Sequence, residues 1–131
     1  MKAHGITRTI LALSFCAAGA LMAGSAAAEG DAAAGEKVFN KCKTCHTLEV
    51  GKNKIGPSLA GVIGRIAGTA EGFAYSDAMK ASGLTWSEEN LTAYLASPKD
   101  FVPGNKMTFA GLKKEADIAN VIAYIKQSGA Q

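Results

Sequence analysis

The run Cys42-Lys43-Thr44-Cys45-His46 constrains this chain more than any other part of its sequence. On a helix, positions 42, 45 and 46 are related as i, i+3 and i+4, so both thiols and the imidazole project from one face. A C-x-x-C-H run is typical of covalent haem attachment, in which two thiols bind one porphyrin and the histidine binds its iron. The run therefore predicts one haem c, attached through Cys42 and Cys45, with His46 as an axial ligand.

Two other kinds of site use a C-x-x-C pair. A structural zinc site needs four ligands, and the chain contains no further Cys or His after His46. A thioredoxin-type redox pair lies near a βαβ pattern, and the sequence shows no such pattern. The fifth residue of the run favours haem attachment over both.

The first 28 residues resemble an export signal. Lys2 and Arg8 form a basic region, residues 9–22 are apolar, and Ser25-Ala26-Ala27-Ala28 offers a small-residue cleavage pattern. An uncleaved anchor and a lipoprotein signal at Cys16 are the alternatives, but the apolar run is short for a membrane span. We predict a signal peptide over 1–28, cleaved after Ala28, and a single domain over 29–131 in the periplasm without stable membrane insertion.

The charge balance excludes one class of partner. The chain has 14 basic and 11 acidic residues, and loss of Lys2 and Arg8 with the signal would leave 12 basic residues and a net charge of +1 instead of +3. A nucleic-acid-binding protein would be much more basic. We therefore expect no nucleic-acid partner.

Helical patterns predict an all-α domain. A first helix should begin after Asp31 and run to about Lys43, and a short one should occupy residues 76–81. A capping box at Thr85 and Glu88 should open a helix that Pro98 ends, and a last helix should span about 115–129. Between them, residues 47–72 and 99–112 are expected to be loops, and no strand is predicted. So long a loop as the first is unusual unless it wraps around something, such as a flat cofactor.

The second axial ligand cannot be a histidine of the mature chain, because His4 lies in the predicted signal peptide. From the residues alone, three possibilities remain: the thioether of Met79, the thioether of Met107, or an open site. An open iron would suit a gas sensor or a peroxidase. A zinc or disulfide module without haem would be a third class of protein.

The chain resembles the class I cytochromes c, both the mitochondrial type and the similar bacterial periplasmic electron carriers. The resemblance covers residues 30–131, and its most specific motifs are the attachment run and Pro103-Gly104-Asn105-Lys106-Met107. Further matching positions are Gly35, Phe39, Gly56-Pro57-Ser58-Leu59, Gly64-Arg65, Phe73-Ala74-Tyr75-Ser76-Asp77, Leu84-Thr85-Trp86, Tyr94-Leu95, Pro98-Lys99 and Tyr124. Two positions depart from the mitochondrial pattern: the segment from His46 to Pro57 is one residue shorter, and Met79 replaces a residue that is often polar.

The resemblance implies a fold and a ligand set. The fold is three longer helices and short turns wrapped around one covalent haem, with Gly35, Phe39 and Tyr124 where the first and last helices cross. The axial ligands are His46 and Met107. The remaining site residues are Pro57, whose carbonyl fixes the His46 tautomer, Arg65, Tyr75 and Trp86 near a haem propionate, and Tyr94 near the Met107 sulfur.

The resemblance also implies an activity. With both faces of the iron occupied there is no place for a substrate, so the protein is expected to be a monomeric electron carrier with a positive potential, and not an enzyme. Lysines around the exposed haem edge are expected to guide docking to acidic surfaces of redox partners. These are Lys41, Lys54, Lys99, Lys106, Lys113 and Lys114.

Overall fold

The computed structural model describes residues 29–129. The predicted signal peptide, residues 1–28, lies outside this part of the chain. Over residues 29–129 the fold is all-α, as predicted: five helices, no strand, and one isolated bridge between Ile66 and Thr85. The longer helices are α1 (Ala32–Phe39), α3 (Glu88–Ala96) and α5 (Glu115–Ser128), and the short ones are α2 (Asp77–Ala81) and α4 (Pro98–Phe101).

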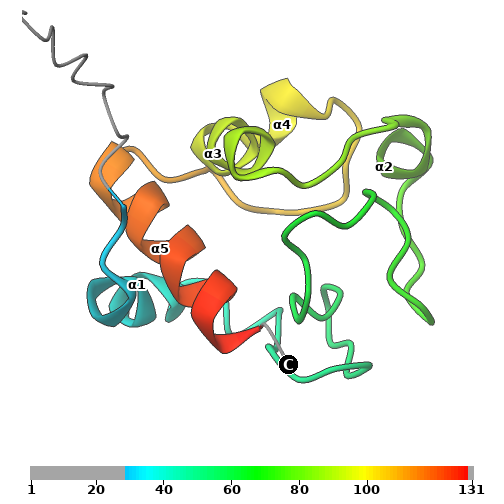
Figure 1. Cartoon of the computed structure of the whole chain (residues 1–131). Coiled ribbons are helices and arrows are strands. Elements are labelled where there is room, and N and C mark those ends of the chain that lie inside the picture. Colours follow the sequence, from blue (N-terminus) through cyan, green and yellow to red (C-terminus); the bar gives the residue numbers. More distant parts are fainter. Residues whose placement is uncertain (1–28, 130–131) are drawn as a thin grey trace, which may run out of the picture.

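Helices α1 and α5 pack against each other and form one side of the molecule, and α3 packs against α5 (Figure 1). At the crossing, a side chain on Gly35 would collide with the backbone of Asn120. Close approach of another backbone is thus the reason for a glycine inside α1. Beside it, the rings of Phe39 and Tyr124 lie 5.4 Å apart.

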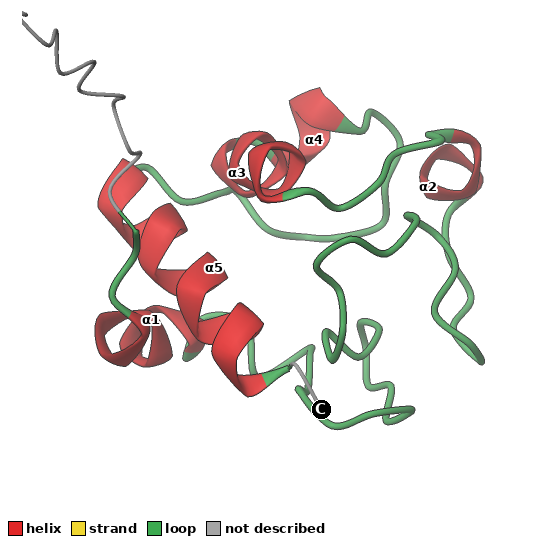
Figure 2. Ribbon diagram, in the orientation of Figure 1, coloured by secondary structure: helices red, strands yellow, loops and turns green. Residues whose placement is uncertain are grey.

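Loops make up most of the side opposite α1 and α5 (Figure 2). The segment between α1 and α2 contains no regular element, as predicted for residues 47–72, and the segment between α4 and α5 returns past α3. The apolar face of α5, formed by Ile118, Val121, Ile122 and Ile125, is buried. The core therefore lies between α5 and these loops.

Three local predictions were wrong. Helix α1 ends at Phe39 and not at Lys43. The first three residues of the predicted loop at 99–112 form a short helix, α4, together with Pro98 before them. The N-cap of α3 is Ser87, whose hydroxyl accepts from the Asn90 amide at 3.1 Å, and not Thr85. Thr85 instead lies in the bridge with Ile66, which keeps the backbone extended up to Trp86.

Within residues 29–129, no helix combines the length and the apolar character that crossing a bilayer requires.

Candidate functional site: a haem pocket

The cysteines and His46 keep helical geometry beyond the end of α1. The amides of Cys45 and His46 both donate to the Cys42 carbonyl, at 3.0 and 2.9 Å. The turn that follows Phe39 therefore holds positions 42, 45 and 46 in the relation that the spacing predicted, although no regular helix extends there. All three side chains line one pocket.

This pocket has a volume of about 230 Å³ and lies between α5, α3 and the two long loops. A single buried water needs only about 10–15 Å³ on such a measure, and protein interiors are otherwise close-packed. The pocket thus has room for a large group. Its lining includes all nine residues assigned to the site from the sequence: Cys42, Cys45, His46, Pro57, Arg65, Tyr75, Trp86, Tyr94 and Met107.

His46 is held in one orientation. Its Nδ1 lies 2.8 Å from the carbonyl oxygen of Pro57, so Nδ1 carries the proton and the Nε2 lone pair is left for a metal. Burial lowers the pKa of His46 and the charge of Lys54 lowers it further, while the hydrogen bond to Pro57 acts in the opposite direction. The imidazole is therefore neutral at neutral pH. Gly56 leaves room for it, because a side chain there would overlap the ring.

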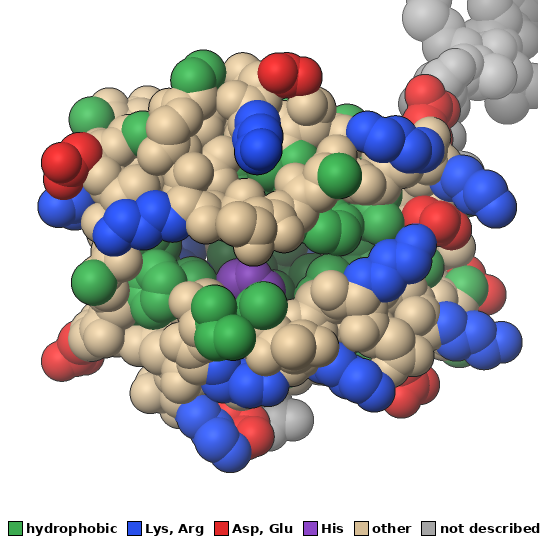
Figure 3. Space-filling model, turned by 180° about the vertical axis from the view of Figure 1, so that it is seen from behind, with side chains coloured by type: hydrophobic (Ala, Val, Ile, Leu, Met, Phe, Trp, Pro, Cys, Tyr) green, Lys and Arg blue, Asp and Glu red, His purple; other side chains and the backbone are tan. Residues whose placement is uncertain are grey.

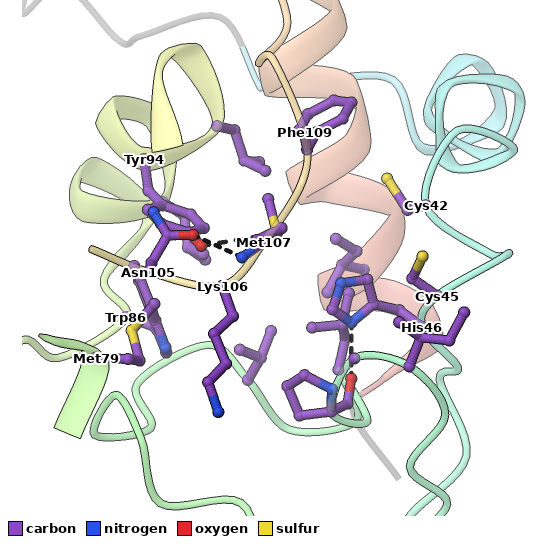
Figure 4. Close-up of a pocket in the computed structure, with 18 of the residues that line it drawn as sticks. Cys42, Cys45, His46, Met79, Trp86, Tyr94, Asn105, Lys106, Met107 and Phe109 are labelled. Atoms are coloured by element: carbon purple, nitrogen blue, oxygen red, sulfur yellow. Dashed lines mark hydrogen bonds between the residues drawn. The ribbon is translucent and has the colours of Figure 1, made fainter. Parts of the chain in front are cut away.

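Met107 faces His46 from the opposite wall, on the segment between α4 and α5 (Figure 4). The Tyr94 hydroxyl lies 3.6 Å from the Met107 sulfur and donates to it. Burial raises the pKa of Tyr94 to about 12, so this phenol stays a donor at neutral pH. Its ring stacks at a tilt on Trp86, 4.9 Å away. Met79, the other methionine considered from the sequence, also lines the pocket, beside Trp86.

Asn105 holds the Met107 segment in place. Its amide nitrogen donates to the carbonyls of Pro98 and Val102, both at 2.8 Å, and its oxygen accepts from the Met107 amide at 2.8 Å. Asn105 stands in a motif that matches the family, but no role was predicted for it from the sequence. It follows Pro-Gly, a position at which asparagine side chains commonly bind nearby backbone, and this position could have indicated its role.

The hydrogen bonding of Arg65 indicates whether the pocket suits a haem. Its two terminal nitrogens donate to the carbonyls of Ala60 at 3.2 Å and Ser58 at 3.0 Å. Its Nε is buried and has no hydrogen-bond partner among the described residues. A buried donor of this kind is costly unless an acceptor meets it, and a carboxylate of a bound group would supply one. A haem propionate fits this requirement.

The thiols also suit covalent attachment. Cys42 and Cys45 are both free and partly buried at the pocket wall. Burial raises the pKa of the Cys42 thiol, an effect that the charge of Lys41 partly opposes. Within residues 29–129, no group of three or more His, Cys, Asp and Glu side chains is placed to bind a metal ion. A haem iron with one imidazole and one thioether ligand does not need such a group.

The pocket opens on one face of the molecule, where a histidine is visible at its floor between hydrophobic side chains (Figure 3). Lysine and arginine side chains lie around this opening. All six lysines predicted to guide docking are exposed, and Lys41 and Lys106 line the pocket itself. The three ion pairs found in the described part of the chain use other lysines: Lys52, Lys80 and Lys126.

The family model for cytochrome c matches residues 32–129. The chain belongs to the cytochrome c family. It is 64% identical over 88 residues to cytochrome c2 iso-2 of Magnetospirillum fulvum, covering 67% of this chain and 92% of that one. It is 50% identical over 123 residues to cytochrome c-554 of Methylosinus trichosporium, covering 93% of each. That match is longer than segment 29–131, so it extends into the first 28 residues.

A solved structure shares this fold. Cytochrome cH from Methylobacterium extorquens is 52% identical, with a TM-score of 0.72, over 75% of this chain and 99% of that one. As a member of the family, this cytochrome c carries one covalently attached haem c at Cys42 and Cys45 and acts as an electron-transfer protein that exchanges electrons with redox partners, not as an enzyme.

Proposed function

We propose that His46 and Met107 bind the haem iron from opposite sides, and that the protein is a periplasmic carrier of single electrons. The observation that carries the proposal is the pair of opposed walls: an oriented, neutral His46 on one and the Met107 sulfur on the other. When bound, the haem supplies one-electron Fe(III)/Fe(II) chemistry. Export is supported by the signal-like sequence of residues 1–28.

The chain's own residues favour the reduced state. Met107 contributes a soft thioether, which stabilises Fe(II) relative to Fe(III). The Tyr94 hydroxyl withdraws electron density from that sulfur by donating to it. Leu91, Val121 and Ile122 on the pocket wall exclude water, which disfavours the additional positive charge of the oxidised form. Each effect raises the midpoint potential, and we expect a positive value.

Tyr75 and Trp86 donate hydrogen bonds to a haem propionate in this proposal, with Arg65 nearby. Arg65 offers its Nε, which has no hydrogen-bond partner within residues 29–129. The Tyr75 oxygen accepts from the Ala70 amide at 3.3 Å, which leaves its O–H to donate elsewhere. Buried charges need such donors or a countercharge.

The exposed lysines Lys41, Lys54, Lys99, Lys106, Lys113 and Lys114 form the docking surface for acidic redox partners in this proposal. The resemblance places all six at the haem edge, and none of them has a carboxylate partner among the described residues. Charges at the rim of an interface steer encounter, and this steering weakens as salt screens it.

Two measurements test the proposed function. A potentiometric titration of the haem-loaded protein is expected to give one reversible single-electron step at a positive potential; a strongly negative midpoint would contradict Met107 ligation. The rate of electron transfer to a purified haem-copper oxidase should fall with salt. Lys54→Gln should flatten this dependence more than Lys126→Gln, which removes the same charge beside Glu88. A rate that does not change with salt would contradict lysine docking.

A further inference from the structure

Ser58 is a buried polar residue in the loop that carries Pro57. It is 4% exposed, and the other buried serine among residues 29–129, Ser76, is 7% exposed. Ser76 has a local role, because its side chain accepts from the Met79 amide as the N-cap of α2. Ser58 lies in a segment where no helix begins. A buried hydroxyl is costly unless it is hydrogen-bonded, so the partners of Ser58 indicate what it does.

Ser58 forms a hydrogen bond through each of its polar groups. Its hydroxyl donates to the Glu49 carbonyl at 2.5 Å and accepts from the Ala60 amide at 3.2 Å. Its amide donates to Oδ1 of Asn53 at 3.0 Å. Its carbonyl accepts from Nη2 of Arg65 at 3.0 Å. These bonds fix the orientation of the two peptide groups on either side of the Ser58 Cα.

One of these two peptide groups carries the carbonyl that orients His46. The Pro57 carbonyl and the Ser58 amide belong to the same planar trans unit, so they point in opposite directions. The carbonyl oxygen lies 2.8 Å from Nδ1 of His46, and the amide donates to Asn53 on the other side. Rotation of this unit would move the carbonyl away from the imidazole. Pro57 adds no hydrogen bond of its own, since proline has no amide hydrogen, and the unit therefore depends on the bonds of Ser58.

We propose that Ser58 is a positioning residue for His46: it holds the Pro57 carbonyl against the Nδ1 hydrogen and so helps to set the midpoint potential of the haem. The inference rests on the proposed function, in which His46 binds the iron. A hydrogen bond from Nδ1 to a carbonyl makes the imidazole a more basic ligand, which stabilises Fe(III) relative to Fe(II). Ser58 thus opposes the effects of Met107 and Tyr94, which favour Fe(II).

The test uses Ser58→Ala in the haem-loaded protein, with two readouts. The first is exchange of the His46 Nδ1 hydrogen in D2O, followed by NMR on the reduced protein. Loss of a hydroxyl that leaves buried partners unsatisfied changes an equilibrium constant by about five- to a hundredfold, so this exchange should be at least about fivefold faster.

The second readout is the midpoint potential. Only the part of the imidazole hydrogen bond that differs between the two oxidation states contributes to it. We therefore expect the ratio of Fe(II) to Fe(III) at a fixed applied potential to rise about threefold in Ser58→Ala, which corresponds to an increase of about 30 mV.

Two further variants accompany the test. Ser76→Ala is the matched control, since it also removes a buried serine hydroxyl, but one that bonds neither Pro57 nor Arg65. It should lower stability and leave exchange of the His46 Nδ1 hydrogen at the wild-type rate. Asn53→Ala frees the same peptide group from its amide side, so it should speed this exchange and raise the potential as Ser58→Ala does.

Three results would overturn the inference. Exchange within twofold of the wild-type rate in Ser58→Ala would show that the Pro57 carbonyl stays in place without the hydroxyl. An equal acceleration at the amides of α5 would show that Ser58 only stabilises the whole fold. A midpoint potential equal to or below that of the wild type would show that this bond does not set it. A wild-type His46 ring whose proton signals lack the large shift caused by a bound haem would instead contradict the proposed ligation, and this is visible before any variant is made.

Discussion

Replacement of Asn105 by alanine is expected to loosen the segment that carries Met107. The side chain makes three hydrogen bonds of 2.8 Å, two to carbonyls of the segment that begins at Pro98 and one from the Met107 amide. Each such bond contributes about 0.5–1.5 kcal/mol net. Because Asn105 is only partly buried, water can replace some of these hydrogen bonds. We therefore expect the closed position of the Met107 segment to lose about 2–3 kcal/mol of stability relative to the open one.

The easier opening of the Met107 segment can be measured as a higher affinity for imidazole. Imidazole can bind the iron only while the Met107 segment is open, so its apparent dissociation constant varies inversely with the open fraction. A loss of about 2–3 kcal/mol raises that fraction roughly 30- to 150-fold. Titration of the oxidised haem protein with imidazole, followed by visible absorption, should therefore show binding tighter by the same factor in Asn105→Ala.

Asn53→Ala is the matched control for this measurement. Its side chain also ties loop to loop, by donating to the Glu71 carbonyl at 2.9 Å and accepting from the Ser58 amide at 3.0 Å, but in the segment that carries Pro57. It should lower stability without changing imidazole affinity. If the dissociation constant of Asn105→Ala for imidazole lies within threefold of the wild-type value, or if Asn53→Ala binds imidazole as tightly as Asn105→Ala, the role given to Asn105 is wrong.

Three further predictions concern the core, the phenol and the haem. Gly35→Val should destabilise the haem protein by about 3 kcal/mol or more in thermal or chemical unfolding, because its side chain would collide with the Asn120 carbonyl; a loss below about 1 kcal/mol would contradict the close crossing. Burial raises the pKa of Tyr94 from 10.0 to about 12, so between these pH values the folded state keeps a proton that the unfolded state has released. The free energy of unfolding should therefore fall as pH rises from 10 to 12, and Tyr94→Phe should remove the share of this fall that comes from the phenol. Without haem, the apolar side chains that line the pocket of about 230 Å³ lose the group against which they pack, in a domain whose whole stability is only about 5–15 kcal/mol. Cys42→Ala/Cys45→Ala protein prepared without haem should therefore show no cooperative melt, and a sharp melt would refute this.

Much of the fold could be predicted because its local rules are visible in the sequence. Asp31 accepts from the amides of Ala33 and Ala34 as a helix cap should, and the apolar spacing in α5 matches its buried face. The N-cap of α3 could not be read in the same way. Thr85 and Ser87 are both acceptable caps by type, and the choice depends on the bridge from Thr85 to Ile66, a contact between distant residues.

Some features of the site could likewise be predicted from the sequence, and others could not. The spacing of Cys42, Cys45 and His46 is a local property, and a single hydrogen-bonded turn preserves it. The three bonds of Asn105 and the burial of Ser58 depend on how the loops fold back on the pocket, which no local pattern encodes. Met79 is a further case, since its burial beside Trp86 becomes apparent only in three dimensions.

In the proposed function, Met107 completes the iron coordination opposite His46. The most direct test of this ligation is the weak far-red absorption band that marks a methionine sulfur on Fe(III), recorded for the oxidised wild type, Met107→Leu and Met79→Leu. Both methionines line the pocket, so each variant is the control for the other. We predict that the band is present in the wild type and in Met79→Leu and absent in Met107→Leu. A band that survives in Met107→Leu, or that is lost in Met79→Leu, would contradict ligation of the iron by Met107.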